Sequence, residues 1–223
     1  MTSEPDAASF APTETPAAQS AAPNRAPNTG RDTAPDAVTT TRPGAVRRAT
    51  AQDAAEVAWL AAVTFPLACP PRSTRSEMAT HIAQKLTVGQ FRDWATSAEH
   101  TLLVYDDGTR LLGYALLALG TPQGAAESAV VREASLRAAP YVELSKIYVL
   151  PDAQGSGVAS GLMQGASDAA AELGPGLPLW LATNTHNQRA QAFYRRSGFE
   201  VVGKRTYAVG GVTHDDLVFL HAR

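Results

Sequence analysis

The sequence feature that most constrains the fold is an apolar strand that leads into a glycine-rich turn and then a helix. Residues 141–150 are YVELSKIYVL, Pro151 ends the strand, and residues 153–163 are AQGSGVASGLM. The first N–H groups of a helix have no partner within the helix and carry partial positive charge. Gly155 and Gly157 precede this helix and have no side chains to block a ligand. The stretch therefore predicts an anion-binding turn at the end of a strand.

Two common phosphate-binding motifs do not match this turn. A Walker loop has a lysine directly after its glycines, and none follows Gly157. A dinucleotide fingerprint has a third glycine and an acidic residue about 20 residues further on, and only Glu172 lies near that distance. The kind of anion therefore has to be inferred from other parts of the chain.

Charge and composition exclude several classes of partner. The chain of 223 residues has 19 basic and 21 acidic residues, so no net charge favours nucleic acid or an anionic membrane. Cys69 is the single cysteine, which excludes an internal disulfide and a cysteine metal cluster, and the five histidines lack metal-ligand spacing. No stretch is apolar enough to cross a bilayer. We therefore expect no metal, no nucleic-acid partner and no membrane partner, and a reducing, cytoplasmic location.

The composition of the chain changes near Gly44. Residues 1–44 hold seven of the 15 prolines and only three large apolar residues, Met1, Phe10 and Val38. Such a segment has too little apolar surface to bury to offset the loss of conformational entropy when the chain becomes ordered. We expect a disordered tail over residues 1–44, rich in Ala, Pro and Thr, and one domain over residues 45–223.

The pattern of this domain indicates alternating helices and strands with hairpins near both ends. One hairpin turns at Asp107-Gly108, and a second turns at Gly210-Gly211. Between them, apolar strands alternate with amphipathic helices, which is typical of a mixed α/β domain. Besides the hairpins, the expected strands are 45–48, 141–149 and 178–183, and the expected helices include 50–65, which Pro66 should end, 157–173 and 187–197.

Two motifs make the chain resemble the GNAT acyltransferase superfamily. QGSGVA at residues 154–159 is similar to that family's pyrophosphate loop, and NTHNQRAQAFYRRSGFEVVG at residues 184–203 is similar to its asparagine-to-tyrosine helix followed by Gly-Phe. The order of elements from Ala45 onward resembles the family as well. The resemblance implies a GNAT acyl-CoA N-acyltransferase fold: a mixed, mostly antiparallel sheet with flanking helices and a splayed central pair of strands at 141–149 and 178–183.

By this resemblance, the anion is the pyrophosphate of acetyl-CoA. Gln154 stands where many members have arginine, and Ala159 replaces a second glycine, which leaves the backbone cradle intact. Backbone groups of a splayed strand otherwise need ladder partners, so they are expected to bond the pantetheine arm. Arg195 and Arg196 first complement the dipole at the end of their helix, and one of the two is expected to reach the adenosine 3′-phosphate of the cofactor. The expected cofactor-binding residues are Ile147, Tyr148, Val149, Gln154, Gly155, Ser156, Gly157, Val158, Ala159, Ser160, Asn187, Phe193 and Arg196.

Tyr194 is the expected general acid. Acyl transfer from a thioester to an amine needs an acid for the leaving thiolate, and a phenol with a pKa of about 10 matches the basicity of that group. Tyr194 lies seven residues after Asn187, so two helical turns place both residues on one face. The resemblance implies the same role for this tyrosine. The alternative is a core aromatic residue beside Phe193.

Glu143 is the expected general base, acting through water. A protonated amine must lose a proton before it attacks, and the single carboxylate of Glu143 lies among apolar residues that favour a raised pKa. The alternative is a solvated glutamate at a strand end. His214, Asp215 and Asp216 form a second candidate cluster, but strand alternation sends the adjacent aspartates to opposite faces.

The expected activity is direct acetyl transfer from acetyl-CoA to a primary amine in a ternary complex. TFPLACPP, ELSKIYVLP and VGKRTYAVGGVTHDDLVF resemble the bacterial spermine/spermidine acetyltransferase branch, which implies a small polyamine as acceptor. The alternatives are a protein or peptide N-acetyltransferase and a catalytically idle acyl-CoA-binding module. No histidine pairs recognisably with Cys69, so a small buried thiol is favoured over a nucleophile. The expected partners are acetyl-CoA and a small amine, with a homodimer left open.

Overall fold

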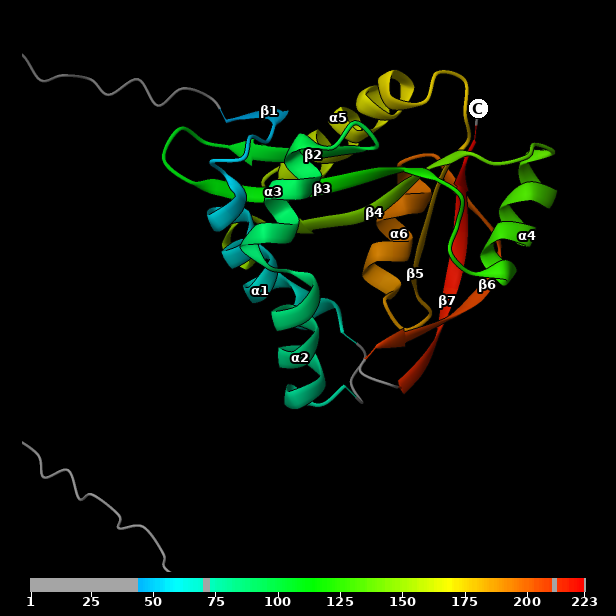
Figure 1. Cartoon of the computed structure of the whole chain (residues 1–223), viewed down its shortest axis with the longest axis horizontal. Coiled ribbons are helices and arrows are strands. Elements are labelled where there is room, and N and C mark those ends of the chain that lie inside the picture. Colours follow the sequence, from blue (N-terminus) through cyan, green and yellow to red (C-terminus); the bar gives the residue numbers. More distant parts are fainter. Residues whose placement is uncertain (1–43, 70–72, 210–211, 223) are drawn as a thin grey trace, which may run out of the picture. The chain divides into compact units, whose positions relative to one another are not determined.

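In the described part of the chain, seven strands form one mixed sheet. The computed structural model describes residues 44–69, 73–209 and 212–222, and the tail predicted over residues 1–44 lies, except for Gly44, outside this part. The strands are β1 (Ala45–Arg48), β2 (His100–Asp106), β3 (Leu111–Gly120), β4 (Tyr141–Val149), β5 (Leu179–Asn184), β6 (Phe199–Val209) and β7 (Val212–His221). Their order is β1-β2-β3-β4-β5-β7-β6, and every neighbouring pair is antiparallel except β4 and β5 (Figure 1). The predicted mixed, mostly antiparallel sheet is confirmed.

The parallel strands β4 and β5 pair over only two residues and then separate. Val142 lies opposite Leu179 and Glu143 lies opposite Trp180, and these two strands, which are described throughout, form no later pairs. β4 continues to Val149 beside β3, while β5 continues beside β7. Figure 1 shows the two strands diverging. The predicted splay is therefore present, and it opens one edge of β4.

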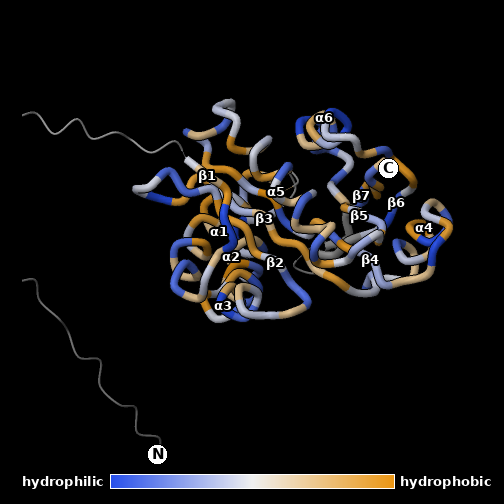
Figure 2. Tube along the Cα trace, turned by 90° about the horizontal axis from the view of Figure 1, so that it is seen from above, coloured by the Kyte–Doolittle hydropathy of each residue, from blue (hydrophilic) through white to orange (hydrophobic). Residues whose placement is uncertain are grey.

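Helices cover both faces of this sheet. They are α1 (Ala54–Ala68), α2 (Arg75–Lys85), α3 (Val88–Thr96), α4 (Ala125–Ser135), α5 (Val158–Leu173) and α6 (Gln188–Arg196). α5 and α6 lie on one face, and α1, α2 and α3 lie on the other, with hydrophobic residues gathered between them (Figure 2). α4 packs against β6 and β7, where Val131 is buried with Trp180. None of these helices, within the described ranges, has the length and apolar character of a membrane span.

β4 contains an extra residue near the point where it leaves β5. Lys146 lies opposite Leu116 of β3, whereas Leu144 lies opposite the next residue of β3, so Ser145 faces no residue there. Such a β-bulge re-aims the side chains that follow it. Glu143 and Lys146 are three residues apart and would point to opposite faces of a regular strand. Because of the bulge, both point to the face that α1, α2 and α3 cover.

α1 runs further than the sequence predicts. We expected Pro66 to end the helix at Phe65, but α1 continues to Ala68 with the proline inside it. A proline in the last turn removes the N–H partner of only one carbonyl group. Leu60 and Thr64 are buried, and the Thr64 hydroxyl donates to the Leu60 carbonyl at 2.7 Å. Packing of this buried face therefore maintains the helix past the proline.

Candidate active site

A cleft of about 1150 Å³ occupies the gap between β4 and β5 and brings most of the predicted site residues together. Ser156 and Val158 do not line it. The Ser156 hydroxyl donates to the carbonyl of Ala153 at 2.7 Å, and Val158 is buried in the core, so these two residues offer only backbone groups. The predicted residues that line the cleft are Glu143, Ile147, Tyr148, Val149, Gln154, Gly155, Gly157, Ala159, Ser160, Asn187, Phe193, Tyr194 and Arg196.

The turn before α5 presents an open helix end to this cleft. Gly155 and Gly157 have φ angles of 88° and 91°, a left-handed conformation that glycine adopts without strain. Gly157 is the N-cap of α5, so no cap side chain bonds to the first turn, and that turn carries no acidic residue. A Cβ atom added at either glycine would meet no other atom within 4 Å. The turn therefore has both the space and the polarity to receive an anion.

Gln154 links this turn to α6. Its side-chain amide donates to the Val149 carbonyl at 3.3 Å and accepts a hydrogen bond of 2.6 Å from Arg189. Gln154 stands where many members of the family that the chain resembles have arginine. Arg189 thus brings a guanidinium group from another element to the glycine turn.

The last turns of α6 place Tyr194 between the core and the cleft. The Tyr194 ring lies 5.8 Å from the Phe219 ring and 6.2 Å from the Phe199 ring, measured between centroids. Burial raises the pKa of Tyr194 to about 12, so its phenol is protonated at neutral pH. At the other end of the helix, Asn187 accepts a hydrogen bond from the backbone N–H of Ala190, which leaves its amide NH₂ group for a ligand. Tyr194 is therefore both a core aromatic residue and a cleft residue.

Glu143 lies where the pairing of β4 with β5 ends. Burial raises the pKa of its carboxyl group, and the charges of Arg205 and Lys146 oppose that rise. Glu143 is thus held in the cleft with cations near it, not solvated at a strand end. A carboxylate in this setting can accept a proton at neutral pH.

A second group of charges lies beside Glu143. Arg205 of β6 contacts the carboxylates of Glu127 and Asp216 at 3.5 and 3.4 Å, and Asp216 lines the cleft while Asp215 is exposed. The two adjacent aspartates therefore point to opposite faces, as strand alternation predicts. The side chain of His214, the third member of the predicted cluster, lies outside the described residues.

Besides Lys85 of α2, four charged cleft residues were not predicted from the sequence: Lys146, Arg189, Arg205 and Glu127. A lysine within an apolar strand was an available signal for Lys146. The other three come from α6, β6 and α4, and their local sequences resemble those of surface charges. Only the topology brings them together.

Comparison with known proteins identifies the family. The model of the Acetyltransferase (GNAT) family matches residues 65–199, which is more than half of the chain. The chain belongs to the GNAT family. Two relatives, "Uncharacterized N-acetyltransferase Rv2669" of Mycobacterium tuberculosis (strain ATCC 25618 / H37Rv) and "Uncharacterized N-acetyltransferase Mb2688" of Mycobacterium bovis, are each 36% identical over 168 residues. That alignment covers 75% of this chain and 96% of each relative. The protein is an acetyl-CoA-dependent N-acetyltransferase.

Solved structures of other GNAT proteins share the fold. The paia N-acetyltransferase from Thermoplasma acidophilum, in complex with coenzyme A, matches with a TM-score of 0.62 at 14% identity, over 82% of this chain and 100% of that chain. NAA60 of Arabidopsis thaliana, in complex with a bisubstrate analogue, matches with a TM-score of 0.58 at 16% identity, over 80% and 98% of the two chains. At these identities the likeness is one of fold.

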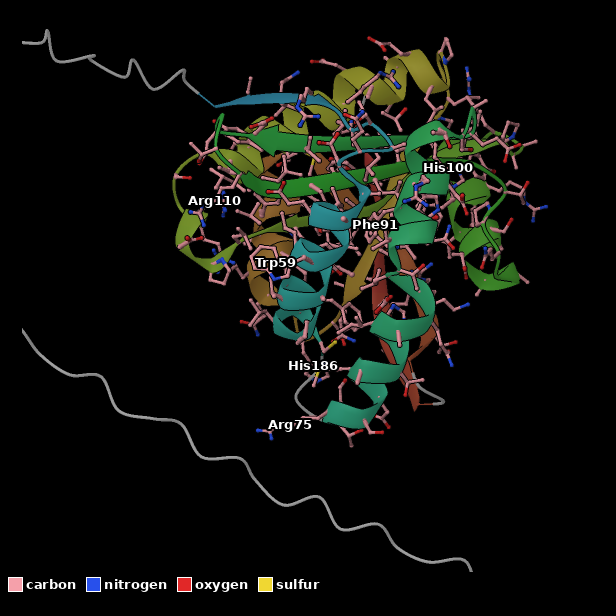
Figure 3. The ribbon with its side chains drawn as sticks, turned by 60° about the vertical axis from the view of Figure 1, so that its left-hand side comes forward. Trp59, Arg75, Phe91, His100, Arg110 and His186 are labelled. Carbon is pink, nitrogen blue, oxygen red and sulfur yellow. The ribbon has the colours of Figure 1, made fainter. Side chains whose placement is uncertain are left out.

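A two-step mechanism through Cys69 in this acetyltransferase is not supported by the geometry. The Cys69 thiol lies in the cleft wall and donates to the carbonyl of Phe65 at 3.4 Å, and burial raises its pKa to about 11. The ring of His81 stacks on the ring of Phe65, and a ring nitrogen of His100 forms a hydrogen bond of 2.9 Å with the hydroxyl of Ser97. Figure 3 shows His100 beside α3. No hydrogen bond joins a described histidine to the thiol. Cys69 is therefore a protonated thiol without a base.

We expect Cys69 to be chemically slow and dispensable for turnover. A thiol with a pKa near 11 holds about 100 times less thiolate at pH 8 than one with its usual value of 9.0. Alkylation by iodoacetamide at pH 8 should be slower than for free cysteine by about that factor. The Cys69→Ser variant should keep the wild-type rate of acetyl transfer. A Cys69→Ser variant without activity, or a covalent acetyl group on Cys69 by mass spectrometry, would contradict this.

Proposed function

We propose that this enzyme transfers the acetyl group of acetyl-CoA directly to a primary amine, and that its acceptor is a small polyamine. The observation that carries the proposal is the separation of β4 from β5 after two residue pairs. In the resulting cleft, the open start of α5, the Tyr194 phenol and the Glu143 carboxylate all face one space. Direct transfer needs these groups: an anion site for the donor, an acid for the thiolate and a base for the amine.

In the proposed complex, the pyrophosphate of acetyl-CoA accepts hydrogen bonds from the backbone N–H groups of residues 154–160. Arg189, which contacts Gln154, adds positive charge at this turn, and Arg196 adds a second positive charge to the cleft from the other end of α6. Related structures determined with coenzyme A and with acetyl-CoA, from Thermoplasma acidophilum and Arabidopsis thaliana, support the choice of donor. The pantetheine arm then lies along Ile147, Tyr148 and Val149, whose side of β4 is not covered by β5.

The proposed reaction is a single displacement. The amine nitrogen attacks the thioester carbonyl, its proton passes through water to Glu143, and the carbon–sulfur bond breaks as Tyr194 protonates the thiolate. Tyr194 is suited to act as an acid because burial keeps its phenol protonated. Glu143 is suited to act as a base because its carboxylate is buried in the cleft but lies near cations.

The acceptor end of the cleft carries three carboxylates: Glu127, Glu143 and Asp216. These groups favour an acceptor with positive charge beyond the reacting nitrogen, and a polyamine has such a charge. Arg205 balances part of this negative charge because it contacts Glu127 and Asp216. The attraction should therefore be moderate and sensitive to salt.

The acceptor is tested with spermidine against a monoamine of equal length, with thiol release as the readout. Spermidine should give the higher kcat/KM. The Asp216→Asn variant should raise KM for spermidine mainly at low salt, because it removes a cleft carboxylate. Asp215→Asn is the matched control, since Asp215 is exposed outside the cleft. Equal use of the two amines would exclude the polyamine, and acetylation of peptides alone would favour a peptide N-acetyltransferase.

The donor site is tested at the glycine turn. Gly157→Val should weaken acetyl-CoA binding by about tenfold or more, because a branched side chain blocks approach to the N–H groups. Gly108→Val is a matched control: Gly108 has a φ of 89°, and a Cβ atom there also meets nothing within 4 Å. Both variants therefore carry the same backbone strain, but Gly108 lies in the β2–β3 turn, outside the cleft. Equal affinities of the two variants by calorimetry would place the donor elsewhere.

The acid is tested by Tyr194→Phe, which removes one hydroxyl and keeps the packing against Phe199 and Phe219. We expect kcat to fall by about 100-fold or more, the effect of losing a positioned general acid. KM for acetyl-CoA should stay within a few-fold, because the contact matters as the thiolate leaves. Tyr105→Phe, outside the cleft, should keep the wild-type kcat. If Tyr194→Phe retains most of its kcat, water is the acid.

Three further expectations belong to this proposal. The catalytic domain covers residues 45–223, with residues 1–44 as a dispensable tail. The cytoplasmic location follows from the single cysteine of the chain. A homodimer is compatible with the proposal and is not required by it, because one chain supplies every group named above.

A further inference from the structure

Lys146 is a half-buried cation that the proposed reaction does not yet use. Its side chain lies in the cleft, with Nζ 5.0 Å from the centre of the Trp94 ring and 3.4 Å from the hydroxyl oxygen of Ser145. It forms no ion pair with any described residue. Even partial burial of an ammonium group without an ion-pair partner costs free energy, because the group loses part of its hydration. An unpaired lysine in a cleft therefore indicates a functional role.

The position of Lys146 depends on the bulge at Ser145. The bulge turns Lys146 to the same face of β4 as Glu143, the residue that ends the pairing with β5. The two charges interact. Burial raises the pKa of Glu143 and lowers the pKa of Lys146, and the charge of each group opposes the shift of the other. Without the extra residue, the lysine would point to the face covered by α5. The bulge thus places an ammonium group beside the proposed base.

We propose that Lys146 is a positioning residue that promotes proton loss from the acceptor amine, because its ammonium group disfavours a second positive charge beside Glu143. The inference rests on the proposed function, in which Glu143 receives that proton. An alkyl amine has a pKa of about 10 and arrives mostly protonated. A cation within a few ångströms in a partly dry cleft favours the neutral form of the amine. The same cation keeps the Glu143 carboxylate ionised until it accepts the proton.

Arg205 is the other cation near Glu143, and it is paired with carboxylates whereas Lys146 forms no ion pair with a described residue. Arg205 of β6 opposes the rise of the Glu143 pKa more strongly than Lys146 does, but its guanidinium group is shared between Glu127 of α4 and Asp216 of β7. A second ammonium group of a polyamine is attracted toward these two carboxylates. Lys146 is therefore the cation that acts on the reacting nitrogen.

The two histidines whose pKa values Lys146 affects, His81 and His100, are neutral. Burial, assisted by the charges of Lys146 and Lys85, lowers the pKa of His81 on α2. Burial also lowers the pKa of His100 on β2, where Glu99 opposes and Lys146 assists the shift. Both imidazoles are thus neutral at pH 7 to 8, so neither offers a charge that could pair with the lysine.

The test is the pH dependence of kcat with saturating amine and acetyl-CoA. In Lys146→Met the acid limb should move to higher pH by about one unit, with most of the high-pH plateau retained, because both the amine and Glu143 then hold their protons more tightly. Lys146→Arg keeps the charge and should restore the wild-type limb. Lys204→Met, an exposed lysine on β6, should not move it. An unmoved limb in Lys146→Met, or a fallen plateau with an unmoved limb, would overturn the proposal.

A second measurement does not depend on activity. The chain has three lysines, Lys85, Lys146 and Lys204, so their side-chain NMR signals can be assigned with single Met variants. Lys146 should be charged at pH 7.5 in the complex with acetyl-CoA; a neutral amine there would overturn the proposal. The Glu143→Gln variant distinguishes the role of Glu143 as the base from the role of Lys146. If it keeps the wild-type kcat, the proposed base is wrong, whereas an unmoved limb in Lys146→Met with an inactive Glu143→Gln refutes only the role of Lys146.

Discussion

The separation of β4 from β5 is the constraint on which the rest of the site depends. A central strand of a sheet normally has both edges paired, and its backbone groups are costly to leave without partners. Here β4 keeps its pairing with β3 but leaves β5 after Glu143. The gap admits a ligand into the middle of the sheet, between elements that a continuous sheet would keep apart. α5, α6 and the charged end of the cleft are all arranged around it.

The gap also separates two groups of polar residues that line the cleft. The open start of α5 and Arg189 of α6 belong to elements on one face of the sheet, and Arg189 contacts Gln154 in the turn before α5. Glu143 and Lys146 point to the other face, toward α1, α2 and α3. In the proposed complex, an anionic donor and a cationic acceptor approach from opposite faces and meet where the strands part. Under this proposal, neither substrate has to cross the site of the other.

The sequence predicted the parts that depend on local pattern. The glycine turn, the helix that begins after Asn187 and the apolar strand before the turn each have a short motif, and the order of elements along the chain resembles that of the GNAT family, which implied the splayed pair of strands. The sequence could not predict the parts that depend on register or on distant partners. No sequence pattern marks the bulge at Ser145. The contact of Arg205 with Glu127 joins β6 to α4, and the two residues are 78 positions apart in the sequence. The helix past Pro66 shows tertiary packing overriding a local rule.

Tyr194 shows why the two interpretations of an aromatic residue, core and catalytic, need not compete. Packing against Phe199 and Phe219 fixes the ring of Tyr194. Holding the hydroxyl in a reactive position therefore costs little additional conformational entropy. The same burial raises the pKa of the phenol, which makes Tyr194 unfit as a base at neutral pH and keeps it available as an acid. Glu143 is half-buried, which raises its pKa as well, but the neighbouring cations oppose that rise. The proposal therefore uses the phenol as the acid and the carboxylate as the base, because a phenol starts from a much higher pKa and the carboxylate has positive charge beside it.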